Sequence, residues 1–349
     1  MISLKNQRII AIWLFICCAT IFFMVILGGV TRLTGSGLSM VEWSPIMGVL
    51  PPLNQTEWLE TFHLYQQFPE YKINNHTMDL NGFKSIYWFE YSHRILGRFI
   101  GILFFFPMVF FFFKGWVKPS LKPKLIAMFI LGGLQGLLGW YMVKSGLVNN
   151  PHVSQYRLVA HLGLALFVYA YILWIGLGLF FHKNDTGNLK KQAVISPLKP
   201  YALVLSFFVF ITLLSGGFVA GLKAGHVFNT FPLMNGQLIP DGLFAIQPAW
   251  LNLFENVMTV QFDHRLMATL LFISIIAFYS VAIRKNLSRR IKLGLHLMLI
   301  MLLIQVSLGI STLLLHVPVA LAASHQAGAL VLFTIVLFVA HQIRQDSLA

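Results

Sequence analysis

The sequence predicts an all-α polytopic membrane protein whose eight transmembrane helices form two parallel-repeat four-helix bundles. Of its 349 residues, 57% are hydrophobic and only 10% are charged, and the mean hydropathy is +0.76. A soluble globular protein does not need so much apolar surface. Several apolar runs of about 20 residues are each long enough to cross a bilayer. Residues of the first half also recur at matching places in the second half, which indicates an internal duplication.

The expected spans follow from the apolar runs in chain order. They cover roughly residues 8–29, 91–113, 124–143, 156–181, 200–221, 263–283, 292–314 and 320–342. Lys5 and Arg8 precede the first run, as in a signal peptide, but the run is too long and lacks a small-residue cleavage site. We therefore expect it to be retained as an anchor. Cys17 and Cys18 lie within it and are expected to be packing residues, because the outer loops hold no disulfide framework.

The formal net charge of +14 is explained by topology. Lysines and arginines cluster at 114–124, 183–199 and 284–292, which an eight-span count places on one side together with both termini. Most acidic residues fall in loops on the opposite side. Because an excess of basic residues marks the cytoplasmic side, we expect both termini in the cytoplasm of a bacterial cell, with the spans in its inner membrane. No nucleic-acid partner is expected.

The duplication is visible in short matched segments at the ends or middles of spans. The pairs are Gly28-Gly29-Val30 with Gly216-Gly217-Phe218, Gln135 with Gln305, and Gly139 with Gly309. Because four spans separate the two copies, both halves have the same orientation and the repeat is parallel. Small residues let membrane helices approach closely, so most of these glycines are interpreted as packing residues.

We therefore expect three parts. An N-terminal four-helix bundle covers 1–182 and contains a long outer loop at 33–88, a cytoplasmic linker covers 183–199, and a C-terminal four-helix bundle covers 200–349. In the outer loop, Asn54 is a helix cap with Glu57 as its acidic third residue. The following apolar residues recur at helical spacing: Trp58, Leu59, Phe62 and Tyr65. They indicate an amphipathic helix at the outer interface, acting as a lid or simply anchored by its aromatic rings.

Four histidines lie near the starts of four spans and form two pairs, His93 with His161 and His264 with His325. An ionisable side chain inside a membrane is costly, so its presence points to function. The spans that bear them all enter from the outer face, so the four side chains should lie at similar depth near that face. One haem iron can take an axial imidazole from each of two facing helices. The pattern thus predicts a haem site in each half.

Other metals suit this pattern less well. Structural zinc usually takes four ligands, often thiolates, and no cysteine cluster is present. The arginines nearest the histidines in sequence are Arg94, Arg98, Arg157 and Arg265. Their guanidinium groups could pair with haem propionates, or could instead extend to lipid phosphates.

The repeat is broken chemically at one position. Glu90 precedes His93 by three residues, and Gln261 precedes His264 by the same interval, one helical turn away on the same face. Only Glu90 can carry charge or move a proton. Burying a carboxylate is costly unless it is paired or protonated. Glu90 is therefore a candidate proton acceptor or stabiliser of positive charge, and the alternative is a structural ion pair with Arg94 or Arg98.

Five stretches carry a resemblance to a known family. They are GGVTRLTGSGLSM at 28–40, YQQFPEY at 65–71, EYSHRILGR at 90–98, QGLLGWYMVKSGL at 135–147 and GHVFNTFPLM at 225–234. Together they resemble the haem A synthase family, and the match extends over nearly all eight spans. The stretch at 65–71 is similar to the form shared by mitochondrial and related proteobacterial members.

The resemblance implies oxidation of the C8 methyl of haem O to the formyl group of haem A, for the terminal cytochrome oxidase. It implies that the C-terminal bundle holds a permanent haem b, whose iron His264 and His325 bind. Arg265, which follows His264, is expected to bind this cofactor through a propionate. The N-terminal bundle would receive the iron of haem O near His93 and His161. Together with these two histidines, Glu90 would be functionally important for catalysis.

The implied partners are a haem O synthase (protohaem farnesyltransferase), cytochrome oxidase assembly factors and membrane lipid, and a homo-oligomer is left open. Some bacterial members carry a cysteine pair in the first outer loop, which this chain lacks. A mechanism that depends on that pair does not apply here.

Two other classes of protein are compatible with parts of the pattern. A dihaem cytochrome b electron carrier would hold two haems but no exchangeable substrate haem. A transporter built on a parallel repeat would hold no haem and would need a polar pathway through the midplane. Few charged residues fall at mid-span, which argues against the transporter.

Overall fold

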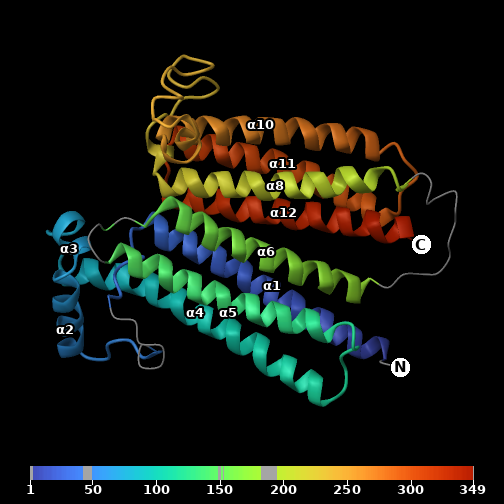
Figure 1. Cartoon of the computed structure of the whole chain (residues 1–349), viewed down its shortest axis with the longest axis horizontal. Helices are drawn as coiled ribbons and strands as arrows, with labels where there is room; N and C mark the ends of the chain where they lie inside the picture. The colour runs from blue at the N-terminus through green and yellow to red at the C-terminus, as the bar shows by residue number, and fades with distance from the viewer. Residues whose placement is uncertain (1–2, 42–48, 148–150, 152, 182–194, 349) are drawn as a thin grey trace. The chain divides into compact units, whose positions relative to one another are not determined.

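The computed structural model describes residues 3–41, 49–147, 151, 153–181 and 195–348 (Figure 1). Within these residues, eight helices are long and apolar enough to cross a membrane. They are α1 Leu4–Leu33, α4 Leu80–Phe113, α5 Lys122–Gly146, α6 Gln155–Phe180, α8 Leu198–Gly221, α10 Val257–Ala282, α11 Arg289–Leu314 and α12 Val319–Leu348. The eight expected spans and the all-α class are confirmed. The described chain contains no strand, only an isolated bridge between Met234 and Gln237.

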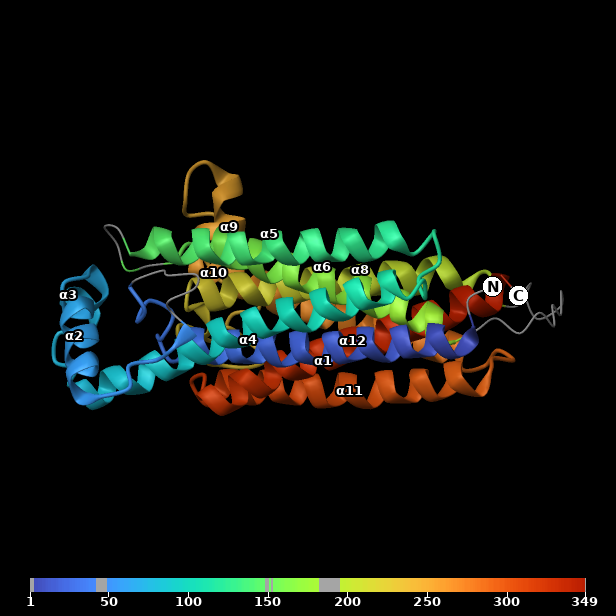
Figure 2. The same cartoon turned by 90° about the horizontal axis from the view of Figure 1, so that it is seen from below.

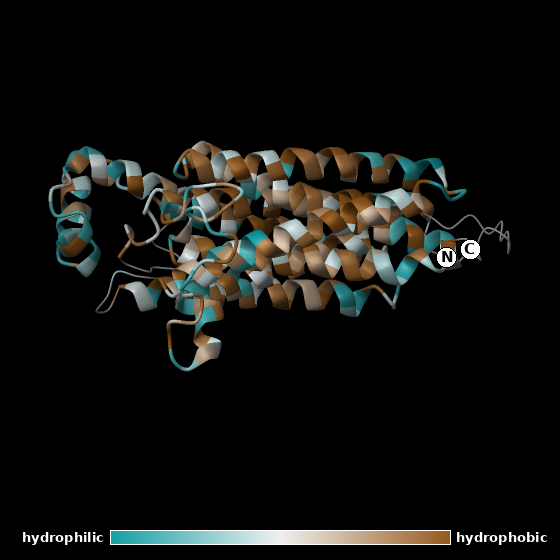
Figure 3. Ribbon diagram, turned by 90° about the horizontal axis from the view of Figure 1, so that it is seen from above, coloured by the Kyte–Doolittle hydropathy of each residue, from teal (hydrophilic) through white to brown (hydrophobic). Residues whose placement is uncertain are grey.

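The helices extend beyond the apolar runs that predict them. The largest difference is in α4, which begins at Leu80 instead of near residue 91, with Asp79 as its N-cap. The Asp79 carboxylate accepts a hydrogen bond from the Gly82 backbone N–H at 2.8 Å. Hydrophobic residues dominate the helices, and hydrophilic residues gather toward their ends and in the loops (Figure 3). The apolar pattern identifies the membrane-crossing part of each helix and misses the more polar first turns.

The chain divides into two compact units. The N-terminal unit is Ala19–Ala165, and the C-terminal unit combines Met1–Cys18 with Leu166–Ala349. In the C-terminal unit, α12 packs against α8 and α11, and α10 packs against the same two helices (Figures 1 and 2). In the N-terminal unit, α4 packs against α5. The expected parts 1–182, 183–199 and 200–349 stay a prediction, and most of the linker, 183–194, lies outside the described residues.

Buried apolar side chains form the core of the C-terminal unit, among them Ile275, Ile291 and Met298, which have no exposed surface. Cys17 and Cys18 are free thiols and are also buried. Their expected role as packing residues agrees with this placement.

The outer loop contains the expected capped helix, α2 Gln55–Gln66, followed by α3 Pro69–Asn74. The side chain of Asn54 accepts a hydrogen bond from the Glu57 N–H at 3.0 Å. The aromatic face of α2 packs against protein: Trp58 contacts Tyr87 and Tyr65 contacts Phe83, with ring centroids 5.0 Å apart in each pair. Thus the early turns of α4 bury the aromatic face of α2, for which the sequence left a lid and an interfacial anchor as alternatives.

The second outer loop holds only short elements among its described residues. These are η2 Ala224–His226, η3 Ala249–Leu251 and α9 Asn252–Glu255. Three prolines occur in this loop, at 232, 240 and 248, and they disfavour long regular structure.

Candidate functional site

The structure places the two predicted histidine pairs in separate units. His93 on α4 and His161 on α6 belong to the N-terminal unit, whereas His264 on α10 and His325 on α12 belong to the C-terminal unit. Within each pair the two rings come from different helices of the same unit. All four side chains are partly buried. Each unit therefore brings together two imidazoles from two helices, as an axial pair for one iron requires.

Each of these imidazole rings lies against a glycine of a neighbouring helix. The contacts pair Gly28 with His93, Gly139 with His161, Gly216 with His264 and Gly309 with His325. A Cβ atom on Gly139 would lie 2.8 Å from Cε1 of His161, and a Cβ on Gly309 would lie at the same distance from Cε1 of His325. These distances are too short for a side chain, so the glycines leave room for the rings. The repeated glycines do serve packing, and what they pack against is the set of candidate ligands.

A glutamine accompanies the second histidine of each pair. Gln135 Nε2 donates to the His161 backbone oxygen at 3.0 Å and lies 3.1 Å from Nδ1 of its ring. Gln305 Nε2 donates to the His325 backbone oxygen at 2.9 Å and lies 3.1 Å from Nδ1. Both glutamine Oε1 atoms are buried and lack a hydrogen-bond partner among the described residues. Each amide therefore binds the backbone of the helix that carries the histidine and lies beside its ring, which holds the ring in position.

The first histidines of the two pairs differ. Nδ1 of His264 lies 2.7 Å from the Ser215 hydroxyl oxygen. Nδ1 of His93 is buried and has no hydrogen-bond partner in the described part of the chain. Sequence reasoning did not single out Ser215, although its place directly before Gly216 in the duplicated segment was a usable signal.

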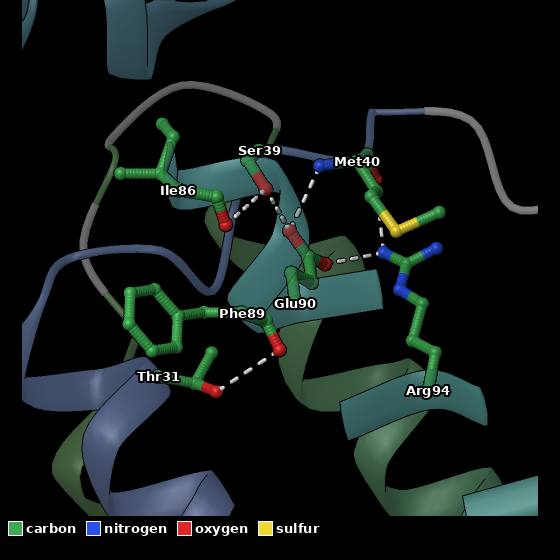
Figure 4. A network of polar contacts seen from close by, with 7 residues as sticks. All are labelled: Thr31, Ser39, Met40, Ile86, Phe89, Glu90 and Arg94. Atoms are coloured by element: carbon green, nitrogen blue, oxygen red, sulfur yellow. Dashed lines mark hydrogen bonds and ion pairs between the residues drawn. The ribbon is translucent and has the colours of Figure 1, made fainter. Parts of the chain in front are cut away.

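Glu90 is tied to the loop that follows α1 (Figure 4). Its side chain is 3% exposed. Oε2 accepts hydrogen bonds from the Ser39 hydroxyl and from the Met40 backbone N–H, both at 2.8 Å. Oε1 pairs with Arg94 Nη2 at 2.5 Å, and the same nitrogen donates to the Met40 backbone oxygen at 2.9 Å. The ion pair with Arg94, one of the two interpretations of Glu90, is present in the structure.

The equivalent residues of the C-terminal unit bind the loop that follows α8. Gln261 Nε2 donates to the Phe228 backbone oxygen at 2.9 Å. Arg265 donates to the backbone oxygens of Phe228 and Thr230, both at 2.8 Å. The repeat therefore preserves a structural role at these positions. Glu90 accepts from a main-chain N–H, whereas Gln261 donates to a main-chain oxygen.

One observation supports the fit of a haem to these sites. Arg265 Nε and Arg98 Nη1 are buried without a hydrogen-bond partner in the described chain. Buried guanidinium donors suit an anionic group such as a propionate. Arg157 instead donates to the Tyr141 hydroxyl at 3.3 Å and stacks on its ring.

Comparison with known proteins identifies the family to which this chain belongs. Residues 11–337 match the family model COX15-CtaA, described as cytochrome oxidase assembly protein. A "Heme A synthase" of Nitrosospira multiformis is 54% identical over 340 residues, covering 97% of this chain and 95% of the relative. One of Nitrosomonas eutropha is 50% identical over 339 residues, with the same coverage. The Homo sapiens "Heme A synthase COX15" is 46% identical over 349 residues, covering 98% of this chain and 84% of the relative. The chain belongs to the haem A synthase family.

Proposed function

We propose that this chain is an oxidoreductase that converts haem O to haem A for cytochrome oxidase assembly, by oxidising the C8 methyl group to a formyl group. The observation that carries the proposal is the presence of two histidine pairs in separate units, each ring set against a glycine. A chain of the haem A synthase family needs a place for its substrate haem, and a second pair allows a resident haem as well.

In this proposal the C-terminal unit holds haem b. His264 and His325 would bind its iron, and the buried Nε of Arg265 would face a propionate. The N-terminal unit would receive haem O, with His93 and His161 at its iron. Haem iron supplies the redox chemistry when bound, and the protein supplies orientation and electrostatics. Haem O is a lipophilic molecule, so a site inside a membrane bundle with access from lipid suits it.

Glu90 would act on the substrate side. It lies on α4 one helical turn before His93, and both of its oxygens accept hydrogen bonds. A carboxylate held in this way is a fixed negative charge close to the substrate site. This arrangement favours stabilisation of positive charge developing at the substrate methyl over the alternative role of proton acceptor. Arg94 and the Met40 backbone hold the carboxylate in place.

The proposed location is the inner membrane of a bacterial cell, with both termini in the cytoplasm and all four histidines near the outer face. The basic residues at 114–124 and 284–292 support this orientation because such residues favour the cytoplasmic side. The proposed partners are a haem O synthase, cytochrome oxidase assembly factors and membrane lipid, and a homo-oligomer is left open.

The experiment is pigment analysis after co-expression with a haem O-forming farnesyltransferase. Haems extracted from the membranes are separated by chromatography, and we expect haem A in cells with the intact chain and none with His93→Ala. Haem b without any haem A would instead identify a dihaem electron carrier. A purified protein without haem would contradict both.

A further inference from the structure

The hydrogen bonds of Ser215 define the protonation pattern of the His264 ring. The Ser215 hydroxyl donates to the Thr212 backbone oxygen at 2.7 Å and lies 2.7 Å from Nδ1 of His264. A carbonyl oxygen can only accept, so the single hydroxyl hydrogen belongs to that bond. Ser215 Oγ must therefore accept from an Nδ1–H group. In this tautomer Nε2 is unprotonated and is the nitrogen available to iron.

The N-terminal unit lacks this arrangement. Gly28 contacts His93 as Gly216 contacts His264, so the residue before the glycine is Leu27 in one unit and Ser215 in the other. A leucine side chain has no atom that can accept a hydrogen bond. Accordingly, Nδ1 of His93 is buried with no partner among the residues that the structure describes.

The surroundings of the other two candidate ligands are closely similar in the two units. His161 and His325 each have a contacting glycine and a glutamine amide nitrogen 3.1 Å from Nδ1. Gln135 Nε2 also lies 3.3 Å from Nε2 of His161. The contrast between Ser215 and Leu27 is the difference at the first histidine of each pair. A hydrogen bond from the distal ring nitrogen fixes the tautomer and ring orientation of a metal-bound histidine and raises its basicity as a ligand.

We propose that Ser215 is a positioning residue that makes the C-terminal unit the permanent haem holder, and that Leu27 keeps haem exchangeable in the N-terminal unit. The inference rests on the proposed assignment of resident haem b to His264 and substrate haem to His93. It explains how two units with repeated sequence can retain a cofactor at one site and release a product at the other. Weak ligation by His93 would let haem A leave after oxidation.

The first test removes the hydroxyl group from the full-length, detergent-purified protein. Haem loss is followed spectroscopically as transfer to excess apomyoglobin, and the haem-to-protein ratio is measured in parallel. Loss of a hydrogen-bond partner of a metal-bound histidine typically costs about 10–100-fold in affinity, so we expect Ser215→Ala to release haem about 10-fold faster or more. Ser215→Thr, which retains a hydroxyl, should restore slow release. The matched control is Ser206→Ala on α8, because the buried Ser206 hydroxyl bonds only to the Ala202 backbone oxygen in the described contacts.

The second test gives the N-terminal unit a hydroxyl. Leu27→Ser should slow haem release from the N-terminal site about 10-fold and raise the amount of haem that co-purifies with the chain. Leu27→Ala is the matched control, because it opens the same space without a hydrogen-bond acceptor and should not raise haem content. The two variants are compared in the His264→Ala background too, where any added haem must be held by the N-terminal unit.

The outcomes separate this inference from the proposed function. The inference would be overturned if Ser215→Ala released haem at the wild-type rate, or if Leu27→Ser and Leu27→Ala retained equal amounts of haem. Either result would count even if the intact chain makes haem A. If the intact chain makes no haem A, the proposed function fails, whatever the release rates. If Ser215→Ala does not accumulate as folded protein, the comparison of Leu27→Ser with Leu27→Ala still tests the inference, because these substitutions lie in the other unit.

Discussion

Glu90 and Arg94 form an ion pair one helical turn apart on α4, with 2.5 Å between Oε1 and Nη2. Both side chains also bind Met40, one through its N–H and the other through its oxygen. The pair therefore joins the histidine-bearing helix to the loop that follows α1. The same carboxylate is a charge near the proposed substrate site and an anchor for this loop, so experiments must separate the two roles.

Glu90→Gln is expected to keep the fold and the resident haem but to lose most haem A formation, by about 100-fold, the scale on which loss of one preorganised electrostatic group lowers kcat. Glutamine preserves the shape and one acceptor oxygen. It removes the negative charge and turns an amide nitrogen toward Arg94 or Met40. The measurement is haem A per resident haem b in membranes that contain haem O.

Ser39→Ala is the control for the contact between Glu90 and the loop that follows α1. It removes one hydrogen bond to Oε2 and leaves the ion pair and the charge of Glu90 in place. We expect this variant to retain most activity. If Ser39→Ala loses as much haem A formation as Glu90→Gln, the role of Glu90 is to hold the loop. If Glu90→Gln forms haem A at the wild-type rate, the catalytic assignment of Glu90 is withdrawn.

The ligand histidines should give opposite results in the two units. His264→Ala or His325→Ala would remove a proposed axial ligand and should lower the haem b content of the purified protein to a small fraction. His93→Ala should leave most of that haem and abolish haem A formation. Absorption spectra of the purified variants measure the resident haem. The opposite pattern, loss of resident haem in His93→Ala only, would reverse the roles of the units.

Replacing the contacting glycines should displace the rings. In Gly139→Ala the new Cβ would lie 2.8 Å from Cε1 of His161, so we expect about 10-fold less haem A with the resident haem retained. Gly309→Ala has the same contact with His325 and should instead lower haem b content. Gly136→Ala is the matched control, because a Cβ there meets no atom within 4 Å. Equal effects of Gly136→Ala and Gly139→Ala would show that helix packing in general, and not the ring contact, is responsible.

The aromatic contacts of α2 should stabilise the outer segment without serving the haem sites. Trp58 is 8% exposed against α4, whereas Leu59 beside it is 50% exposed. Trp58→Ala should cost about 3 kcal/mol locally, releasing α2 to proteolysis, and Leu59→Ala should not. Haem b content should stay normal in both variants. Loss of resident haem in Trp58→Ala would mean that α2 supports the haem sites directly.

The depth of the histidines can be tested with membrane-impermeant redox reagents. The four helices that bear them should all enter from the outer face, so reagents added outside should react with the resident haem faster than reagents confined inside. Vesicles of the two orientations allow the comparison. Equal rates from both sides would contradict the proposed placement.

Much of the molecule could be predicted from local sequence because the bilayer imposes simple rules. A span must be apolar over about 20 residues, so the eight helices were predicted. The start of α4 was missed because its first turns, from Leu80, are amphipathic and carry no membrane signal. The sequence left the role of α2 open for a related reason: the spacing of Trp58 and Tyr65 fits an interfacial helix and a helix that packs against protein equally well.

The sequence by itself determined the helical membrane class, the candidate histidines and the positions of their repeated glycines and glutamines, since these depend on composition and on matched spacing. Tertiary structure alone decided which groups meet those residues. Ser215 and His264 are 49 residues apart, and Glu90 and Met40 are 50 residues apart. Such contacts depend on how each helix is rotated toward its neighbour and on where the connecting loop folds back. Hydropathy does not encode either property, because an apolar helix is equally stable in the membrane whichever face it turns toward its neighbours.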